Sequence, residues 1–268
     1  MTAHPAPLDV EALREQVFAG SRAWRRIDVV AETGSTNADL IARAGGGEDI
    51  AGAVLIAENQ TAGRGRRGRS WSAVPFAQIT MSVGLDGTGV PSSAWGWLPL
   101  ATGVAVVDAV ADTGVTAGLK WPNDVLAGGG KLAGILAEVA GGQQAVVLGV
   151  GLNVSLRGED VGVEGATSLV DLGVPAPDRQ RLVVRLLHEL GNRVESWARA
   201  AGADAGLAAD YRARSLTLGR RVRALLPGDQ QVVGVARDVD EQGRLVIDAD
   251  GRSVIVSAGD IVHLRPDQ

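Results

Sequence analysis

Residues 58–71 read ENQTAGRGRRGRSW, and the second half of this stretch carries four arginines within six positions, interleaved with three glycines. No acidic residue occurs between Glu58 and Asp86. Glycine lets the backbone adopt positive φ and come close to a ligand, while the guanidinium group offers paired donors to carboxylate or phosphate oxygens. The stretch therefore predicts a loop that binds an anion, such as a polyphosphate or an adenylate.

Lysine is almost absent from the chain. Of its 26 lysines and arginines only Lys120 and Lys131 are lysines, and both lie in one stretch that reads KWPNDVLAGGGK. An ammonium group is compact and titratable, which a guanidinium group is not. The placement favours a functional role for these two amines, although biased codon usage is the alternative explanation.

Length and composition indicate an α/β type of enzyme with one large domain, or a large and a small one. The chain has 268 residues, of which 46% are hydrophobic, 21% are charged and 37 are glycine, unlike a disordered or fibrous protein. The formal net charge of −5 disfavours nucleic-acid binding by the surface as a whole. The arginines of residues 64–69 thus form a local positive field.

Several kinds of site are excluded by what the sequence lacks. There is no cysteine, so disulfides, thiolate catalysis and cysteine-ligated zinc are excluded. The three histidines, His4, His188 and His263, are far apart in the sequence, and we predict no metal ligands from the protein. The first residues show no basic segment followed by an apolar run, and no stretch approaches about 18 uninterrupted apolar residues. We therefore expect a cytoplasmic protein with no membrane partner.

Hydrophobic periodicity predicts the elements that carry the motifs. Helices are expected at residues 10–18, 38–44, 95–111 and 178–199, and strands at residues 27–31, 53–57, 78–85, 120–126, 132–139 and 145–154. Ser35 or Thr36 caps the second helix and Asp178 the fourth. The last two strands form a hairpin that turns at Gly141 and Gly142.

After Ser215 the sequence alternates between apolar and polar residues. The alternating segments are RRVRALL, QVVGVARDV, RLVIDA and RSVIVSAGDIVHL, and the turns between them are Pro227-Gly228, Gln242-Gly243 and Asp250-Gly251. This pattern predicts a small antiparallel barrel. At roughly 50 residues it is near the lower limit for an independent domain, so we expect it to pack against the larger one.

Two nucleotide-binding motifs match the glycine-rich stretches only formally. Residues 63–68 satisfy GxGxxG, but a dinucleotide-binding turn must open a helix, and here a new strand is expected within a few residues. Gly130 and Lys131 resemble the end of a P-loop, but Val125 replaces its first glycine and Leu132 its hydroxyl residue. A basic nucleic-acid arm is the remaining alternative for the arginines, although such arms normally occur at a terminus or on a basic face.

Residues 120–124, KWPND, place a cation, an aromatic ring, a rigid turn, an amide and a carboxylate next to one another. An ordinary strand entry with Trp121 in the core would explain fewer of these residues. Residues 149–153, GVGLN, permit two interpretations: a buried strand with bulges, or glycines that let a ligand lie against the strand.

Five motifs in this order and spacing resemble those of biotin protein ligases. They are GSTN at 34–37, ENQTAGRGRRGRSW at 58–71, KWPNDVL at 120–126, GKLAGIL at 130–136 and GVGLNV at 149–154. The resemblance covers residues 27–154, continues more loosely to the C-terminus and is closest to actinobacterial forms. It implies an α+β fold in which a mixed or antiparallel sheet carries helices on one side, like the catalytic core of class II aminoacyl-tRNA synthetases, followed by a small C-terminal SH3-like β-barrel. The implied domains are a partly mobile N-terminal segment at 1–26, a catalytic domain at 27–214 and the barrel at 215–268.

The resemblance also implies the activity. The family activates biotin with ATP and Mg²⁺ to biotinyl-5′-AMP, releases pyrophosphate, and transfers biotin to one lysine of the biotin carboxyl carrier domain of acyl-CoA carboxylases. ATP and biotin are substrates, and no tightly bound prosthetic group is implied. A carboxylate must approach the α-phosphate of a polyanion, so positive groups have to offset the repulsion of like charges.

Site residues follow by matching the motifs. The biotin-binding set is Ser35, Thr36, Asn37, Gln60, Gly63, Arg64, Gly65, Arg66, Trp71, Lys131, Gly134, Leu136, Gly149 and Gly151. The ATP- or adenylate-binding set is Arg66, Arg69, Ser70, Trp71, Ser72, Lys120, Asn123, Asp124, Lys131 and Asn153. The residues expected to act in catalysis are Lys131, Arg64 and Asp124, and Asp124 is a candidate to orient or deprotonate the acceptor lysine.

Some members of the family carry an N-terminal winged helix and repress transcription. Here about thirty residues precede the GSTN motif, too few for a helix-turn-helix domain and linker, so we expect no DNA partner. Two alternative functions remain open. A lipoate-type ligase shares the fold and the adenylation step but would lack the arginine loop and the KWPND run. A non-enzymatic biotin sensor would not release pyrophosphate.

Overall fold

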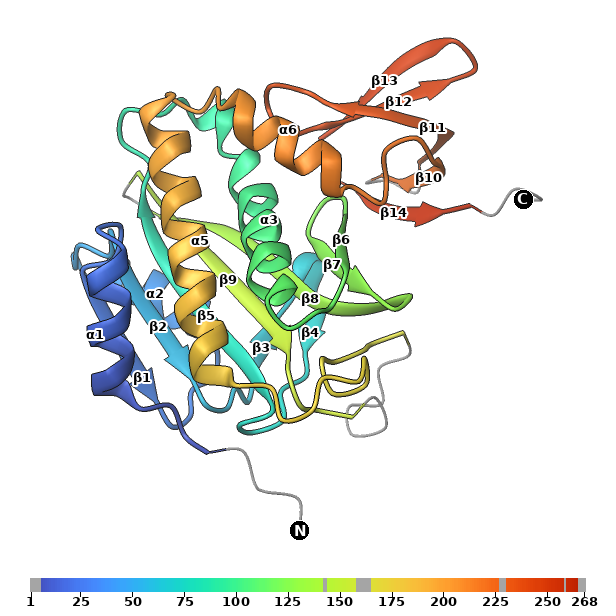
Figure 1. Cartoon of the computed structure of the whole chain (residues 1–268). Coiled ribbons are helices and arrows are strands. Elements are labelled where there is room, and N and C mark those ends of the chain that lie inside the picture. The colour runs from blue at the N-terminus through green and yellow to red at the C-terminus, as the bar shows by residue number, and fades with distance from the viewer. Residues whose placement is uncertain (1–5, 142–143, 158–164, 227–229, 258, 265–268) are drawn as a thin grey trace.

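The computed structural model describes residues 6–141, 144–157, 165–226, 230–257 and 259–264. Its centre is a seven-stranded mixed sheet in the order β1-β2-β5-β9-β8-β7-β6, in which β1 and β2 are parallel and all other neighbours are antiparallel (Figure 1). The strands are β1 (Arg26–Val30), β2 (Ala53–Ala57), β5 (Gln78–Asp86), β6 (Ala117–Lys120), β7 (Asp124–Ala127), β8 (Gly130–Ala140) and β9 (Ala145–Asn153).

Helices cover both faces of this sheet, unequally. The helices α1 (Val10–Gly20), α3 (Trp97–Ala111) and α5 (Arg179–Arg199) contribute to the main core, together with Val54, Ile56 and Leu148 of the sheet. On the opposite face α2 (Thr36–Gly45) packs against Leu55 and Val147. Neighbouring residues of a strand point to opposite faces, so β2 is buried along its whole length. The predicted fold class is confirmed, and among the helices that the structure describes α2 is the one on the far side (Figure 1).

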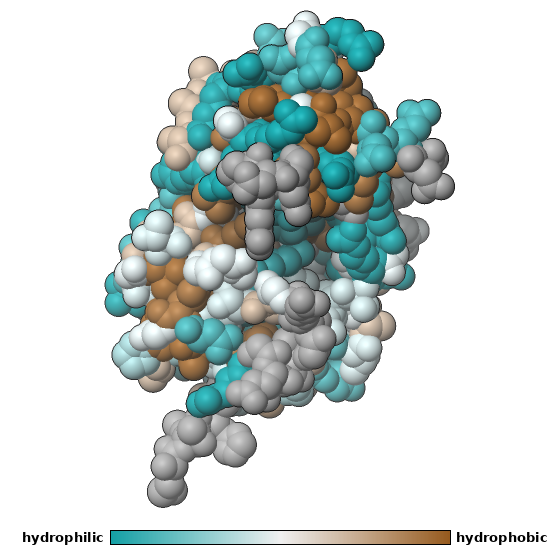
Figure 2. Space-filling view, turned by 90° about the vertical axis from the view of Figure 1, so that its right-hand side faces the viewer, coloured by the Kyte–Doolittle hydropathy of each residue, from teal (hydrophilic) through white to brown (hydrophobic). Residues whose placement is uncertain are grey.

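The central helix α3 is apolar nearly all round, as predicted. The stretch Ser92–Ala111 is, by length and composition alone, apolar enough to cross a membrane, but 72% of its most apolar 18-residue window is buried inside the molecule. Such burial is typical of a core helix. On the side shown in Figure 2 hydrophilic residues predominate, with smaller apolar patches between them.

The predicted strand at residues 120–126 is wrong. Lys120 ends β6 and Asp124 begins β7, and the two residues face each other across an antiparallel pair with a three-residue turn between them. Pro122 lies in that turn, because proline has no N–H to donate to a β-ladder and its φ is fixed. The indole of Trp121 anchors the turn, since its Nε1 donates to the Gly243 carbonyl at 3.1 Å.

Other predicted elements agree with the structure. Ser35 caps α2, where its Oγ accepts from Ala38 N at 3.5 Å, and Asp178 caps α5 by accepting from Arg181 N at 3.0 Å. β8 and β9 form the predicted hairpin, although Gly142 of its turn lies outside the described residues. The helix α6 (Ala205–Arg214), capped by Asp204, was not predicted, because its few apolar residues give only weak periodicity.

Five further strands form the C-terminal sheet, in the order β13-β12-β11-β10-β14 and antiparallel throughout. They are β10 (Arg221–Leu225), β11 (Gln231–Val239), β12 (Leu245–Ala249), β13 (Arg252–Val256) and β14 (Asp260–His263). The segment RSVIVSAGDIVHL therefore contains two strands on opposite edges of the sheet, since β14 pairs with β10 and β13 with β12. The predicted turn at Pro227-Gly228 lies outside the described residues.

The C-terminal sheet packs on the larger domain, as the sequence predicts. Trp97 Nε1 donates to the Glu241 carbonyl at 3.1 Å. Gly96 and Gly243 meet in this interface, where a Cβ added to Gly96 would fall 2.2 Å from the Gln242 carbonyl oxygen. Only glycine allows such an approach of two backbones.

Candidate active site

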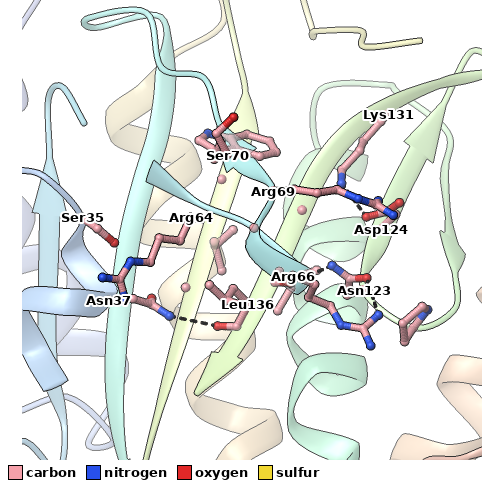
Figure 3. Close-up of a pocket in the computed structure, with 18 of the residues that line it drawn as sticks. Ser35, Asn37, Arg64, Arg66, Arg69, Ser70, Asn123, Asp124, Lys131 and Leu136 are labelled. Carbon is pink, nitrogen blue, oxygen red and sulfur yellow. Dashed lines mark hydrogen bonds and ion pairs between the residues drawn. The ribbon is translucent and has the colours of Figure 1, made fainter. Parts of the chain in front are cut away.

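A cavity of about 900 Å³, counted with its open mouth, lies over β8 and β9. Its walls come from segments that are far apart in the sequence: the start of α2, the arginine loop, the turn between β6 and β7, and β14 of the C-terminal sheet. Figure 3 shows side chains from the first three of these segments, with Lys131 and Leu136 of β8, around one space. The cavity thus brings together all five motifs on which the family resemblance rests.

Polar residues at the start of α2, together with Gln60, line one end of the cavity, and partners behind them hold them in place. Thr36 donates from its backbone N and its hydroxyl to Gln60 Oε1, at 2.9 and 3.0 Å. Asn37 Nδ2 donates to Glu138 Oε2 at 2.8 Å, and Asn37 Oδ1 accepts from Ser82 Oγ at 2.6 Å. Because each group is held by a partner, this end offers fixed donors and acceptors to a small polar ring.

Sequence reasoning missed Ser82 and Glu138. The available signal for Ser82 was a hydroxyl inside an otherwise apolar strand, since a buried polar group needs a partner. Glu138 gave no such signal, because it lies near the end of the long β8 strand, where a charged residue is expected at a surface. Its position beneath Asn37 depends on how α2 packs on the sheet.

Glycines of β8 and β9 form the floor of the cavity. A Cβ added to Gly149 would fall 2.3 Å from Asn37 Oδ1, and one added to Gly151 would fall 2.3 Å from Trp71 Cε2. A Cβ at Gly134 would meet both Trp71 and Lys131 at 3.1 to 3.2 Å. The glycines therefore make room for the side chains that shape the site, which neither interpretation of the GVGLN motif anticipated.

The arginine loop folds into a two-stranded ribbon, β3 (Gly63–Arg64) and β4 (Ser70–Trp71), around one 3-10 turn, η1 (Arg66–Gly68). Arg67 occupies the left-handed region at φ 56°, which a residue other than glycine rarely adopts. Arg66 Nη1 donates to Asn123 Oδ1 at 3.2 Å and to the Gly259 carbonyl at 3.4 Å. Arg67 Nη2 donates to the Leu225 carbonyl at 3.3 Å. The loop thus connects the KWPND turn with the C-terminal sheet.

The opposite end of the cavity is strongly cationic. Lys131 Nζ lies 2.6 Å from Asp124 Oδ1 and 5.9 Å from the centroid of the Trp71 ring. Arg64, Arg66, Arg69 and Lys120 line the same cavity. Among the described lining residues Asp124 is the only acidic one. Such a surplus of positive charge suits a polyanionic ligand.

Most of the residues predicted from the sequence line this cavity. They are Ser35, Thr36, Asn37, Gln60, Arg64, Gly65, Arg66, Arg69, Ser70, Trp71, Lys120, Asn123, Asp124, Lys131, Gly134, Leu136, Gly149 and Gly151. The lining also includes Met81, Trp121, Pro122, Ile135, Val150 and Ile261, which were not predicted.

Three predicted residues do not line the cavity. Gly63 pairs with Trp71 in the ribbon, and Ser72 follows that ribbon, with its carbonyl accepting from a glutamine side chain. Asn153 is buried, where its Nδ2 donates to the carbonyls of Lys131 at 3.3 Å and Thr167 at 2.9 Å. From this position Asn153 holds the strand that carries Lys131.

Behind the KWPND turn a threonine joins the two domains. Thr217, fully buried, accepts from Trp121 N at 3.1 Å and lies 3.1 Å from His263 Nε2. Burial, together with the nearby charges of Lys120 and Arg220, lowers the pKa of His263 to about 4. His263 is therefore neutral at pH 7 and adds no positive charge to this side of the site.

Comparisons with known proteins agree with this geometry. A biotin–[acetyl-CoA-carboxylase] ligase of Mycobacterium tuberculosis is 62% identical to this chain over 97% of both proteins. The chain belongs to the biotin protein ligase family. Residues 47–155 match the model of the biotin/lipoate A/B protein ligase family, and residues 217–264 match that of the biotin protein ligase C-terminal domain.

More distant members of the family share the architecture. The bifunctional ligase/repressor BirA of Escherichia coli is 33% identical over 91% of this chain and 76% of its own length. A structure of the Aquifex aeolicus biotin protein ligase with biotin and ATP superposes with a TM-score of 0.76 at 24% identity, covering 90% of this chain and all of the other, and shows a common fold. The Leishmania major enzyme with biotinyl-5-AMP gives a TM-score of 0.58 at 25% identity, with coverage of 87% and 99%.

Proposed function

We propose that this protein is a biotin–[acetyl-CoA-carboxylase] ligase, which joins biotin to ATP as biotinyl-5′-AMP and then transfers the biotinyl group to a lysine of a carrier domain. The observation that carries the proposal is the 62% identity to a ligase of this name over 97% of both chains. The cavity supports it, because a polar network and a cationic surface occupy its two ends. We place the reaction in the cytoplasm, where ATP is supplied.

In the first step a carboxylate oxygen of biotin attacks the α-phosphorus of ATP, and pyrophosphate leaves. Both reactants are anions, so the step needs positive charge that is already in place. Arg66, Arg69 and Lys131 provide it from the arginine loop and β8. Arg64, whose Nη1 lies 4.0 Å from Glu138 Oε1, is placed toward the polar end, and we assign it to cover biotin.

Binding of biotin is assigned to the polar network around α2. The ureido ring of biotin carries both donors and a carbonyl acceptor, which matches a site where donors and acceptors alternate. Ser35, Thr36, Asn37 and Gln60 supply these groups, and the glycine floor keeps the path to Lys131 open. The KWPND turn, with Asn123 and Asp124, then faces the side from which an acceptor lysine enters.

Magnesium is assigned to this site as part of the ATP substrate. Among the residues that the structure describes, no group of three or more histidines, aspartates and glutamates could hold a metal ion. Mg²⁺ is therefore assigned to the phosphates of ATP, with which it enters as a complex, and it would lower their negative charge there. The protein's own contribution is the set of fixed cations.

In the second step the neutral amine of the acceptor lysine attacks the acyl carbon of biotinyl-5′-AMP. An amide bond forms, the bond from the acyl carbon to the phosphate oxygen breaks, AMP leaves, and the amine loses a proton. We assign the acceptor to the biotin carboxyl carrier domain of acyl-CoA carboxylases. Asp124 lies where it can orient that amine.

The decisive experiment measures pyrophosphate release from ATP with biotin, and separately with lipoate. Lipoate is included because the matching family model covers both kinds of ligase. Wild type should release pyrophosphate with biotin but not with lipoate. Lys131→Ala should lose on the order of 100-fold or more in kcat/KM, as for loss of one transition-state donor. Arg237→Ala removes an exposed cation of the C-terminal sheet and should leave kcat/KM for pyrophosphate release unchanged. Release with lipoate alone, or without any acid, would refute the proposal.

A further inference from the structure

A chain of hydrogen bonds runs from the end of the cavity assigned to biotin into the protein behind it, and it ends on one carboxylate. Asn37 lines the cavity, whereas Ser82 and Glu138 lie behind its lining residues. Ser82 is fully buried, and the side chain of Glu138 is 29% exposed. The proposed reaction steps use neither residue, yet both contact Asn37.

The strand β8 brings Glu138 to this place. Gly134, Leu136 and Glu138 occupy every second position of the strand, so their side chains lie on the same face of the sheet. Gly134 and Leu136 line the cavity. Glu138 follows them at the point where α2 packs on the sheet, and its Oε2 accepts from Asn37 Nδ2 at 2.8 Å.

The partners of Asn37 fix the direction in which its amide points. Besides the bond to Glu138, Nδ2 donates to the Leu136 carbonyl at 3.3 Å (Figure 3). A carboxylate and a carbonyl have no hydrogen to donate, so only the nitrogen of the amide can face them. Oδ1 consequently faces Ser82, whose hydroxyl donates to it at 2.6 Å.

The direction set at Asn37 is passed on to Thr36. A serine hydroxyl has one hydrogen, and that of Ser82 is used by Asn37. The hydroxyl hydrogen of Thr36 has two acceptors within reach, Ser82 Oγ at 2.6 Å and Gln60 Oε1 at 3.0 Å, so it stays inside the network. Thr36 therefore has an oxygen lone pair, and no hydrogen, left for a ligand. Each ureido nitrogen of biotin carries a hydrogen that needs such an acceptor.

We propose that Glu138 is a positioning residue for biotin. Through Asn37 and Ser82 its carboxylate sets the direction of these hydrogen bonds, and the Thr36 oxygen is thereby kept as an acceptor for an N–H of the ureido ring. Without the carboxylate only the longer contact with the Leu136 carbonyl holds Nδ2, and the amide can turn. Ser82 then receives a hydrogen from Nδ2 and donates its own to Thr36, which occupies the lone pair that biotin needs. This role of Glu138 rests on the proposed function, to whose biotin site it adds a residue.

The charge of Glu138 has a second neighbour, because its Oε1 lies 4.0 Å from Nη1 of Arg64. The Arg64 side chain is 56% exposed, and an exposed ion pair of this length contributes little. A role through Arg64 depends on the charge, whereas the role through Asn37 depends on a hydrogen-bond acceptor. Glutamine at position 138 separates the two, because it keeps the size and an acceptor oxygen and removes the charge.

The experiment measures Kd for biotin by isothermal titration calorimetry in the absence of ATP, and KM for ATP from pyrophosphate release at saturating biotin. Glu138→Met has a similar size and lacks the acceptor. We expect it to raise Kd for biotin about tenfold or more and to leave KM for ATP unchanged, as for a buried donor that loses one partner. Glu138→Gln should bind biotin within about twofold of wild type, because the exposed charge contributes little. Glu15→Met makes the same exchange at an exposed position of α1 and should behave as wild type.

Double-mutant cycles test the path from Glu138 to Thr36. Asn37→Ala should weaken biotin binding by itself, and Glu138→Met should then add little, because no amide is left to orient. In Ser82→Ala no hydroxyl remains to donate to Thr36, so Glu138→Met should again have little further effect. Glu138→Leu is a second variant without an acceptor, for use if Glu138→Met does not fold.

Four results would overturn the inference. Glu138→Met could bind biotin like wild type, or Glu138→Gln could bind it as weakly as Glu138→Met, which would point to the charge. The effects of Glu138→Met and Asn37→Ala could add in full, and Glu138 would then not act through Asn37. Both variants without an acceptor could lose cooperative unfolding in urea, and Glu138 would then support the fold and not the ligand. Failure of wild type to release pyrophosphate with biotin would instead refute the proposed function, and it is distinguishable because the calorimetric titration requires no turnover.

Discussion

Replacing Gly151 by alanine tests whether Trp71 is a wall of the ligand site. A Cβ at position 151 would fall 2.3 Å from Cε2, 2.5 Å from Cζ2 and 2.8 Å from Nε1 of the indole. Carbon atoms in contact rest about 3.5–4.0 Å apart, so the two groups must separate by about 1 Å or more. Gly151 pairs with Thr80 on one side and with Gly134 on the other, and the strand has little freedom to move. The indole, which is partly exposed at the end of a two-residue strand, therefore moves instead.

The size of the expected effects follows from the fact that the indole of Trp71 can move whereas the strand that carries Gly151 cannot. Overpacking a core typically lowers the free energy of unfolding by about 1–3 kcal/mol, and we expect about 1 kcal/mol here because the indole can leave. The displaced ring enters the cavity, so substrate binding is weakened more than the fold is destabilised. We expect KM for ATP and for biotin to rise about tenfold or more, equivalent to about 1.4 kcal/mol of binding.

Urea unfolding measures the change in the free energy of unfolding, and pyrophosphate release measures KM for ATP and for biotin. Gly149→Ala is the comparison on the same strand: its Cβ would fall 2.3 Å from Asn37 Oδ1, so it should weaken biotin more than ATP. Gly45→Ala, where nothing lies within 4 Å of the added methyl group, should leave both KM values unchanged. Gly151→Ala with wild-type KM for both substrates would refute the assignment of Trp71 to the wall.

Three further predictions concern the links around the site. Thr217→Val should lower the free energy of unfolding by about 1–3 kcal/mol in urea titrations, because Trp121 N loses its buried acceptor. Thr217→Ser keeps the hydroxyl group and should restore most of the lost stability. Equal stabilities of wild type and Thr217→Val would contradict the role of this hydrogen bond. The folded pKa of His263, about 4, lies below its unfolded value of about 6.5, so its contribution to the free energy of unfolding is complete above pH 6.5 and is lost as the pH falls. After allowance for partial exposure, we expect a loss of about 1–2 kcal/mol toward pH 4. His263→Gln should lack this part of the pH dependence, and a pH profile of stability that does not change in the variant would disprove the prediction. Glu58→Gln should lower the free energy of unfolding by about 3 kcal/mol, because Arg179 is buried against Glu58 and would keep an uncompensated charge. Asp49→Asn, which removes one partner of an exposed pair, should leave the stability nearly unchanged.

The sequence by itself determined the elements whose signals are local. The cap at Asp178 and the apolar face that follows it specify α5, because both act within a few residues of the chain. The five motifs determined the family and most of the cavity lining, since each is a short run whose residues stay together in any fold. Glycines 149 and 151 were recognisable as special positions, but the side chains that occupy the space above them were not.

Only the tertiary structure decided which distant groups meet. The break between β6 and β7, the two strands within RSVIVSAGDIVHL and the contact of Arg66 with the Gly259 carbonyl depend on pairing with partners elsewhere in the chain. The Lys131–Asp124 pair depends on the register and bulge between β7 and β8, which set how the two side chains approach. Register and packing are fixed by the sum of many long-range contacts, so no window of the sequence contains them.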